Sequence, residues 1–182
     1  MGDLARLKKS VLGGTGTIRE DQRSSVRAFL VHCYVNSEML DRGRLHIAAV
    51  CVGTAERLIE ESVRYARERR QFGKAIGEFQ LIQAMLADSR TESYAARCMV
   101  VDATRRRDAG ENVSELAACC KLFASEMVGR VADRAVQIFG GAGYMAEYPI
   151  ERFYRDVRLF RIYEGTSQIQ QLVIARHMLD EG

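Results

Sequence analysis

The segment Tyr163–Gln168 contains residue types that could abstract a proton. Glu164 is an acid directly before Gly165, and Thr166 and Ser167 are good cap residues for a following helix. A carboxylate that removes a proton from carbon needs a dry pocket to raise its basicity, and a helix N-terminus nearby supplies donors for a polar ligand. Alternatively, Glu164 is an ordinary exposed acid, because acids near helix starts are favoured by the helix dipole. The segment alone leaves both interpretations open.

Helical patterns cover most of the chain, so helices must hold the segment Tyr163–Gln168 in place. Apolar residues at helical spacing predict five helices, at 40–70, 78–109, 114–139, from Pro149 onward and at 168–179. Gly110 and then Gly140 and Gly141 are expected to end the second and third helices. Long helices with short breaks predict an all-α fold, an up-and-down four-helix bundle with an additional short helix and a C-terminal helix.

Three details of these helices are specific enough to be checked. Ser114 is expected to cap the third helix. The second helix is expected to bury three residues, Leu81, Met85 and Cys98. The apolar positions of the last helix are Ile169, Leu172, Val173 and Met178.

The composition is that of a soluble protein with a real core. The chain has 182 residues, of which 47% are hydrophobic and 28% charged, and this length suits one domain. The net charge of +3 comes from interspersed charges of both signs, which argues against nucleic acid as a partner. No apolar run is long enough to cross a bilayer, and the N-terminus lacks the layout of a signal peptide, so no membrane partner is expected.

The cysteines and histidines do not predict a metal site. Five cysteines, Cys33, Cys51, Cys98, Cys119 and Cys120, show no paired ligand spacing, and we interpret them as reduced core residues of an intracellular protein. No histidine has a glutamate three residues before it, as di-iron helical bundles require.

Three glycine- or arginine-rich stretches have different interpretations. Residues 141–146 match the dinucleotide pattern G-x-G-x-x-A in letters, but they follow a predicted helix rather than a strand, so a helix end is the better interpretation. The arginine triplet 105–107 is expected to be a solvated face near a helix end. In 67–73, by contrast, arginines run directly into Phe72 and Gly73, a reasonable surface for a pyrophosphate or a flat ring.

Taken together and in this order, several stretches make residues 40–179 resemble the C-terminal domain of the acyl-CoA dehydrogenases, flavoenzymes that desaturate acyl-CoA thioesters. The stretches are Leu40–Arg44, Arg67–Gly73, Phe79–Gln80, Gln137–Tyr144 and Tyr163–Gln168. Any one of them alone would be weak evidence. Their shared order and spacing shift the interpretation of Glu164 from an ordinary acid to a functional one.

The resemblance implies roles for individual residues. Glu164 would be the catalytic base, removing the proton next to the thioester carbonyl while the flavin N5 accepts a hydride, with the carbonyl polarised by the flavin ribityl hydroxyl and the Glu164 amide. The residues that would touch acyl-CoA are Asp41, Arg42, Gly43, Arg44 and Gly165. Contacts to the FAD of a neighbouring subunit would come from Arg69, Gln71, Phe72, Gln80, Gln137, Ile138, Phe139, Gly140 and Gly141. Contacts to the flavin of the chain's own site would come from Thr166, Ser167 and Gln168.

The resemblance also implies partners and a subgroup. Contacts that cross between subunits imply a homodimer or homotetramer, and the family passes electrons to an electron-transfer flavoprotein or a similar acceptor. Isovaleryl and long-chain members place their base at the position of Gly43, which cannot take a proton. With Gly43 there and Glu164 present, the chain resembles the short, medium and short-branched group. The family works in the mitochondrial matrix or the bacterial cytoplasm.

The N-terminal part departs from the family pattern. We expect residues 1–39 to be an atypical segment, in which Val11–Gly16 resembles the end of the family linker and residues 17–38 match nothing, and residues 40–182 to be the helical domain. The family's helical N-terminal domain and middle β domain are not in this sequence, so the isolated chain is expected to bind FAD poorly and turn over little. One function is therefore the catalytic-base domain of an FAD-dependent acyl-CoA dehydrogenase. The alternative is a helical-bundle interaction or assembly module without catalysis.

Overall fold

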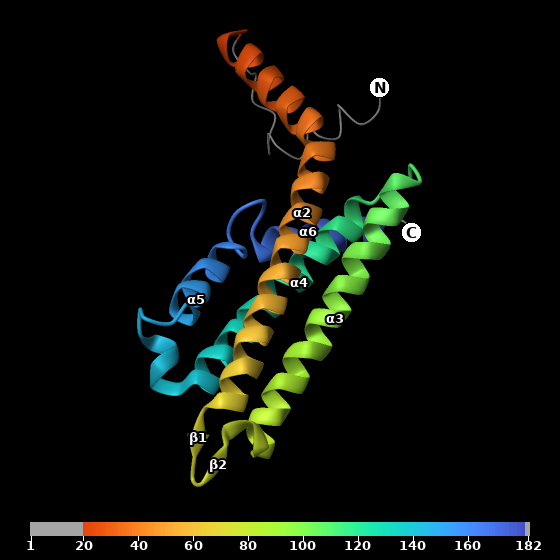
Figure 1. Cartoon of the computed structure of the whole chain (residues 1–182). Helices are drawn as coiled ribbons and strands as arrows, with labels where there is room; N and C mark the ends of the chain where they lie inside the picture. The colour runs from red at the N-terminus through yellow and green to blue at the C-terminus, as the bar shows by residue number, and fades with distance from the viewer. Residues whose placement is uncertain (1–19, 181–182) are drawn as a thin grey trace. The chain divides into compact units, whose positions relative to one another are not determined.

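Helices make up most of the chain in the computed structural model, which describes residues 20–180. The helices of this part are α2 (Glu20–Glu68), α3 (Gln80–Asp108), α4 (Ser114–Phe139), α5 (Ile150–Leu159) and α6 (Ser167–Asp180) (Figure 1). Between them lie a two-residue antiparallel hairpin, β1 (Arg70–Gln71) and β2 (Lys74–Ala75), and the 3₁₀ helices η1 (Ile76–Glu78) and η2 (Gly140–Tyr144). The predicted all-α fold is confirmed.

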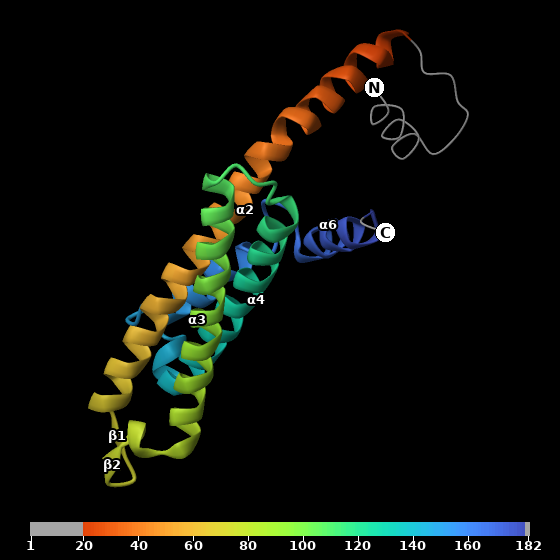
Figure 2. The same ribbon diagram turned by 90° about the vertical axis from the view of Figure 1, so that its right-hand side faces the viewer.

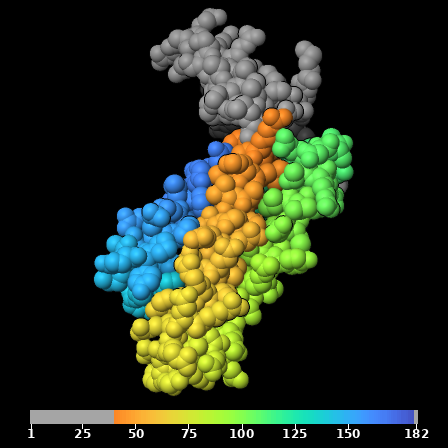
Figure 3. Space-filling model, viewed as in Figure 1, coloured from red at the N-terminus to blue at the C-terminus, as the bar shows by residue number. Residues whose placement is uncertain are grey.

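Helix α4 is the centre of the unit that begins at Glu38. It packs against α3, α5 and α6, and Figures 1 and 2 show α2, α3 and α4 running up and down beside one another while α6 crosses them. In the space-filling view, α2 lies between α5 and α3 (Figure 3). One end of α4 lies beside the turn between α5 and α6, and the other end lies beside the hairpin.

The core is built where small and branched side chains of these helices meet. Its fully buried members include Ala48, Cys51, Ala55 and Leu58 of α2 and Ala117, Ala124, Met127 and Val128 of α4. Alanines two turns apart on α2 and on α4 let the helix backbones approach closely. Cys51, Ala55, Leu58 and Met127 belong to the apolar patterns from which α2 and α4 were predicted.

Several helix ends differ from the sequence expectations. Helix α2 begins at Glu20 rather than residue 40, and α4 begins with Ser114 itself. Val113 occupies the cap position without a side-chain hydrogen bond, while the Ser114 amide donates to Asn112 Oδ1 at 3.1 Å, so the predicted Ser114 cap is wrong. Thr166 does cap α6, because its Oγ1 accepts from the Ile169 amide at 3.3 Å.

The predicted burial of some apolar side chains is also wrong. Leu81 is 80% exposed because it lines an open hollow beside the hairpin, and Cys98 is exposed as well. On α6, for which no burial was predicted, the apolar residues Ile169, Leu172 and Met178 are exposed, while Ser167 and Gln170 are buried. Among the cysteines with described side chains, Cys51 and Cys120 are buried as predicted.

The remaining expectations concern the N-terminus, membranes and the glycine-rich stretch 141–146. The segment Val11–Gly16, which resembles the family linker, lies outside the described residues. Within residues 20–180, no helix combines the length and apolarity needed to cross a bilayer. The G-x-G-x-x-A letters of 141–146 follow α4 and lie largely in η2, so their reading as a helix end rather than a dinucleotide site is supported.

Candidate active site

The turn between α5 and α6 has an unusual backbone at its centre. Glu164 has φ 54° and Gly165 has φ 84°, so two successive residues lie in the left-handed region. A glutamate there is strained by its Cβ, whereas a glycine is not. Strain of this kind persists only where the surroundings determine the conformation, and it is concentrated at functional sites.

The Glu164 side chain lies against Gly43 of α2. A Cβ added to Gly43 would stand 2.7 Å from Glu164 Oε2 and 3.1 Å from its carboxyl carbon. Any larger side chain at position 43 would therefore displace the carboxylate. The structure thus brings together two segments that the sequence separates by about 120 residues, and Glu164 is half-buried at their meeting point.

The rest of the 41–44 segment is turned partly inward. Arg44 is 8% exposed, and its Nη1 donates to Asp41 Oδ1 at 2.9 Å. The second carboxylate oxygen of Asp41 accepts from Ser114 Oγ at 2.8 Å, which ties α2 to the start of α4. Arg42, in contrast, is exposed. Asp41 and Arg44 therefore shape the segment, and Arg42 is the member left free to meet a ligand.

Two buried side chains hold the backbone of the turn, and the sequence reasoning missed both. Lys121 of α4 is completely buried, and its Nζ donates to the Gly165 carbonyl at 2.6 Å. Gln170 of α6 is also completely buried, and its Nε2 donates to the Glu164 carbonyl at 3.0 Å and the Gly165 carbonyl at 3.1 Å. A lysine within the apolar pattern of α4 is the sequence signal that could have identified this contact.

A second set of contacts closes the ends of the turn. The Ser167 amide donates to the Arg161 carbonyl at 3.2 Å. Glu126 of α4 accepts from Ser167 Oγ at 2.7 Å and pairs with Arg161 at 3.3 Å. Arg161 lies across Gly129, where a side chain would collide with its guanidinium. Lys121, Glu126 and Gly129 thus make one face of α4 a support for the whole turn.

Burial determines the ionisation of the groups around the turn. Burial lowers the pKa of Lys121 from its ordinary value, although the acidic groups near it oppose the shift. Burial raises the pKa of Tyr163, and the negative charge of Glu164 acts in the same direction. The pKa of Cys51 is raised to about 12, chiefly by burial. Cys51 is therefore a neutral, unreactive thiol near neutral pH.

The residues expected to meet a neighbouring flavin gather at the other end of α4. Gln71, Phe72, Gln80 and Ile138 all line one open hollow of about 730 Å³, formed by the hairpin, the start of α3 and the end of α4. Phe72 is 91% exposed and meets Phe79 edge to face, while Lys74 Nζ lies 4.3 Å from the Phe79 ring centroid. An exposed aromatic ring beside amide side chains suits a flat, polar-edged ligand.

Not every residue expected at this end faces outward. Phe139 is 6% exposed, and its ring stacks on Tyr65 with centroids 4.0 Å apart, so its side chain belongs to the core. Arg69, Gln137, Gly140 and Gly141 are exposed around the same end of the bundle. Gly140 ends α4 with φ 62°. Contacts from Phe139 to a ligand are therefore restricted to its backbone.

The two groups of residues are far apart within one chain. Lys121, under the turn, and Ile138, in the hollow, are separated on α4 by 17 residues, or about 26 Å at 1.5 Å per residue. Thr166, Ser167 and the exposed Gln168 belong to the turn end. The structure thus brings the expected site residues together as two clusters rather than one.

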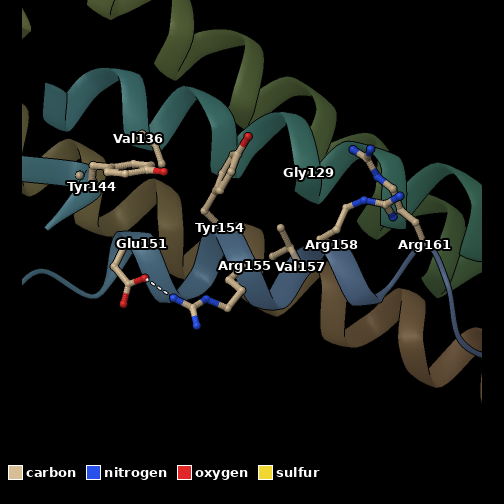
Figure 4. A pocket seen from close by; sticks show the side chains of 10 residues that line it. Gly129, Val136, Tyr144, Glu151, Tyr154, Arg155, Val157, Arg158 and Arg161 are labelled. Atoms are coloured by element: carbon tan, nitrogen blue, oxygen red, sulfur yellow. Dashed lines mark hydrogen bonds and ion pairs between the residues drawn. The ribbon is translucent and has the colours of Figure 1, made fainter. Parts of the chain in front are cut away.

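A further pocket contains none of the residues to which the sequence assigned a catalytic or binding role. It has a volume of about 560 Å³ and lies between α4, η2 and α5. Tyr144 lies at one end, Tyr154 in the middle, and Arg158 and Arg161 at the other end, while Arg155 pairs with Glu151 (Figure 4). Arg161 is shared between this pocket and the support of the turn.

Comparisons with known proteins identify the family to which the chain belongs. Residues 33–179 match the family described as acyl-CoA dehydrogenase, C-terminal domain. The chain is 51% identical over 140 residues to the probable acyl-CoA dehydrogenase YngJ of Bacillus subtilis, covering 77% of this chain and 37% of that protein. It is 46% identical over 140 residues to the caffeyl-CoA reductase-Etf complex subunit CarC of Acetobacterium woodii, with the same coverage.

A solved structure gives the same picture. The butyryl-CoA dehydrogenase of Megasphaera elsdenii superimposes with a TM-score of 0.79 at 40% identity, over 80% of this chain and 38% of that one. The chain thus spans somewhat more than a third of the length of the relatives it matches. It belongs to the acyl-CoA dehydrogenase family, and the part that it shares with its relatives is the C-terminal helical domain.

Proposed function

We propose that this chain supplies the catalytic base and part of the flavin site of an FAD-dependent acyl-CoA dehydrogenase. The observation that supports this most directly is the half-buried Glu164 carboxylate held over Gly43. The position that carries the base in other members of the family is glycine here, so Glu164 is the acid left to act. A carboxylate in a restricted, partly dehydrated position is suited to act as a general base.

In this mechanism, Glu164 removes the proton from the carbon next to the thioester carbonyl. FAD, when bound, supplies the acceptor for the hydride that leaves the next carbon. The proton is acidic enough only if the carbonyl is polarised, and the Glu164 amide is suited to donate to it, since no acceptor for this amide is found among the described residues. In the reverse direction, reduction of an enoyl thioester, the same carboxyl group would return the proton.

The substrate contacts divide into two kinds. Arg42, which is exposed, would bind the polar part of acyl-CoA, while Asp41 and Arg44 would hold the α2 segment in shape through their ion pair. Gly43 and Gly165 would touch acyl-CoA through their backbone, because the spaces that their side chains would fill are taken by Glu164 and Gln170. Removing the Arg42 charge should therefore weaken substrate binding more than the chemical step.

The distance between the two clusters supports an oligomer with shared flavin sites. A flavin ring beside Glu164 would lie too far from the hairpin of the same chain, about 26 Å away along α4, to touch Phe72. The hollow lined by Gln71, Phe72, Gln80 and Ile138 would instead bind the FAD of a neighbouring subunit in a homodimer or homotetramer. The relative from Acetobacterium woodii is named as part of an Etf complex, which supports an electron-transfer flavoprotein as the acceptor.

A domain replacement tests this function. Residues 40–179 are substituted for the corresponding domain of the Megasphaera elsdenii butyryl-CoA dehydrogenase, and reduction of an artificial acceptor is measured with butyryl-CoA. We expect a yellow, active enzyme in which Glu164→Gln reduces kcat by at least about a thousandfold. Glu147→Gln, at an exposed acid after η2, is the matched control and should retain activity.

Two results would count against the proposal. A yellow, correctly assembled replacement enzyme without activity would show that this domain lacks the base, and would favour an interaction or assembly module. Full activity of Glu164→Gln would show that a residue other than Glu164 acts as the base. The isolated chain, assayed in parallel with added FAD, measures how much of the site this domain forms alone.

A further inference from the structure

A completely buried lysine in an apolar helix face needs a reason, because burying an ammonium group is costly without a partner. Lys121 occupies such a position on α4, where its neighbours in the core include Ala117 and Ala124. Its Nζ reaches the Gly165 carbonyl at 2.6 Å, a short charge-assisted hydrogen bond. The lysine therefore connects the core of the bundle to the centre of the α5–α6 turn.

Gln170 makes the complementary contact from the other side of the turn. Its Nε2 donates to the carbonyls of both Glu164 and Gly165, at 3.0 and 3.1 Å. These are the carbonyls of the two residues in the left-handed region. Three hydrogen bonds from two buried side chains thus hold the carbonyls of the strained Glu164 and of Gly165 after it.

We propose that Lys121 and Gln170 are positioning residues that hold Glu164 and Gly165 in the left-handed conformation and thereby direct the Glu164 carboxylate towards Gly43. The consequence for catalysis rests on the proposed function, whereas the structural part does not. Without the two donors, the backbone at Glu164 would relax to negative φ, and its side chain would leave the space above Gly43.

The structural part is tested by hydrogen exchange on the full chain without ligand. The reporters are the Ser167 amide, which donates across the turn to the Arg161 carbonyl, and the flanking amides of Tyr163 and Gln170, which donate to the Leu159 and Thr166 carbonyls. Lys121→Met and Gln170→Met remove the donors while keeping an unbranched side chain. Each should accelerate exchange at these amides by roughly 10- to 100-fold relative to the amides of α3.

Met127→Ala is the matched control for a general loss of stability. Met127 is completely buried two turns further along α4, and its truncation opens a cavity without removing a contact to the turn. In Met127→Ala, amide exchange should accelerate throughout the bundle, with no greater increase at the turn than elsewhere. Should both donor variants behave like Met127→Ala, with no excess exchange at the turn, the positioning role is overturned. Gln170→Met decides the question alone if Lys121→Met does not fold.

A kinetic readout separates positioning from simple structural support. In the replacement enzyme, both donor variants should lower kcat by about tenfold or more while KM for butyryl-CoA changes by less than about threefold, because binding does not need the aimed carboxylate. A change in KM alone contradicts the inference. If the parent replacement enzyme is itself inactive, the proposed function fails, and the exchange experiment still decides the role of Lys121 and Gln170.

Discussion

The Glu164 carboxylate occupies the space that a side chain at Gly43 would fill, with Oε2 2.7 Å from the position of an added Cβ. Gly43 on α2 therefore determines where the acid on the α5–α6 turn can lie. The contact is specific, because Gly53, on the same helix, has nothing within 4 Å of an added Cβ. Substituting Gly43 and Gly53 in turn therefore separates the effect of filling the space beside Glu164 from the effect of helix propensity.

Gly43→Ala should displace the carboxylate and lower kcat of the replacement enzyme by roughly tenfold or more, since small misplacements of a catalytic group have large effects. Gly53→Ala should leave kcat unchanged and stabilise the helix by about 0.5–1 kcal/mol. Steady-state kinetics and thermal unfolding measure the two effects. Equal kcat for both variants would mean that the space above Gly43 has no catalytic role.

Gly165 should be more sensitive to substitution than another glycine with the same backbone. Gly165 and Gly110 both have φ 84°, but an added Cβ meets Gln170 Nε2 at 2.5 Å only at Gly165. Gly110→Ala should lower the free energy of unfolding by about 1–2 kcal/mol through backbone strain alone. Gly165→Ala should cost about 1 kcal/mol more, because it also disturbs the Gln170 hydrogen bonds. Chemical denaturation measures both values.

Phe72 should contribute to flavin affinity without contributing to stability. Its ring is 91% exposed beside the hollow at the hairpin. Phe72→Ala should weaken FAD binding to the replacement enzyme by roughly 5- to 10-fold, the effect of losing one aromatic contact. Tyr94→Ala, at an exposed tyrosine on α3, should change neither affinity nor melting temperature. Flavin absorbance titrations measure the FAD affinity of both variants. An unchanged affinity in Phe72→Ala would show that the hairpin is not part of the flavin site.

The buried thiols should make stability fall at alkaline pH. Burial raises the pKa of Cys51 and of Cys120 from 9.0 to about 12. Because the folded pKa is raised, the stabilising contribution is complete below pH 9 and is lost as pH rises from 9 towards 12. Each thiol adds a slope of about 1.4 kcal/mol per pH unit in that range. Urea unfolding measures the slope of unfolding free energy against pH. Cys51→Ala should reduce this slope by the contribution of one thiol, whereas Cys98→Ala, at an exposed cysteine, should leave it unchanged.

An acid between α3 and α4 should affect stability in the opposite pH range. Glu92 accepts hydrogen bonds from Arg134 at 2.8 Å and Arg130 at 2.9 Å. Partial burial opposes its ionisation, but the two guanidinium groups outweigh this and lower the pKa of Glu92 below 4.5. Glu92→Gln should cost about 1 kcal/mol at pH 7, and the difference should disappear as pH falls below 4.5. Glu56→Gln, in the more exposed pair with Arg97, should cost less.

The fold was largely predictable because its signals are local. The apolar spacing that includes Met127 and Val131 determines α4, and Gly110 and Gly140 mark helix ends regardless of what packs nearby. The exposed Leu81 shows the limit of this reasoning, because an apolar position predicts burial without identifying the partner that covers it. The short hairpin at 70–75 was missed because its strands have only two residues each.

The site was less predictable because its geometry is long-range. The proximity of Glu164 to Gly43 depends on how α2 and the α5–α6 turn pack on α4, which no local pattern contains. Lys121 and Gln170 were overlooked for the same reason, since their partners are backbone carbonyls that any residue possesses. Resemblance could name Glu164, but only the structure reveals what supports it.

The separation of the turn from the hairpin along α4 has a genetic consequence. If each flavin lies between the turn of one subunit and the hairpin of another, as proposed, two differently damaged copies can complement each other. A subunit carrying Glu164→Gln still lends an intact hairpin, and one carrying a defective hairpin still lends an intact acid. Co-assembled, each mixed pair would regain one working centre, whereas either mutant alone would have none.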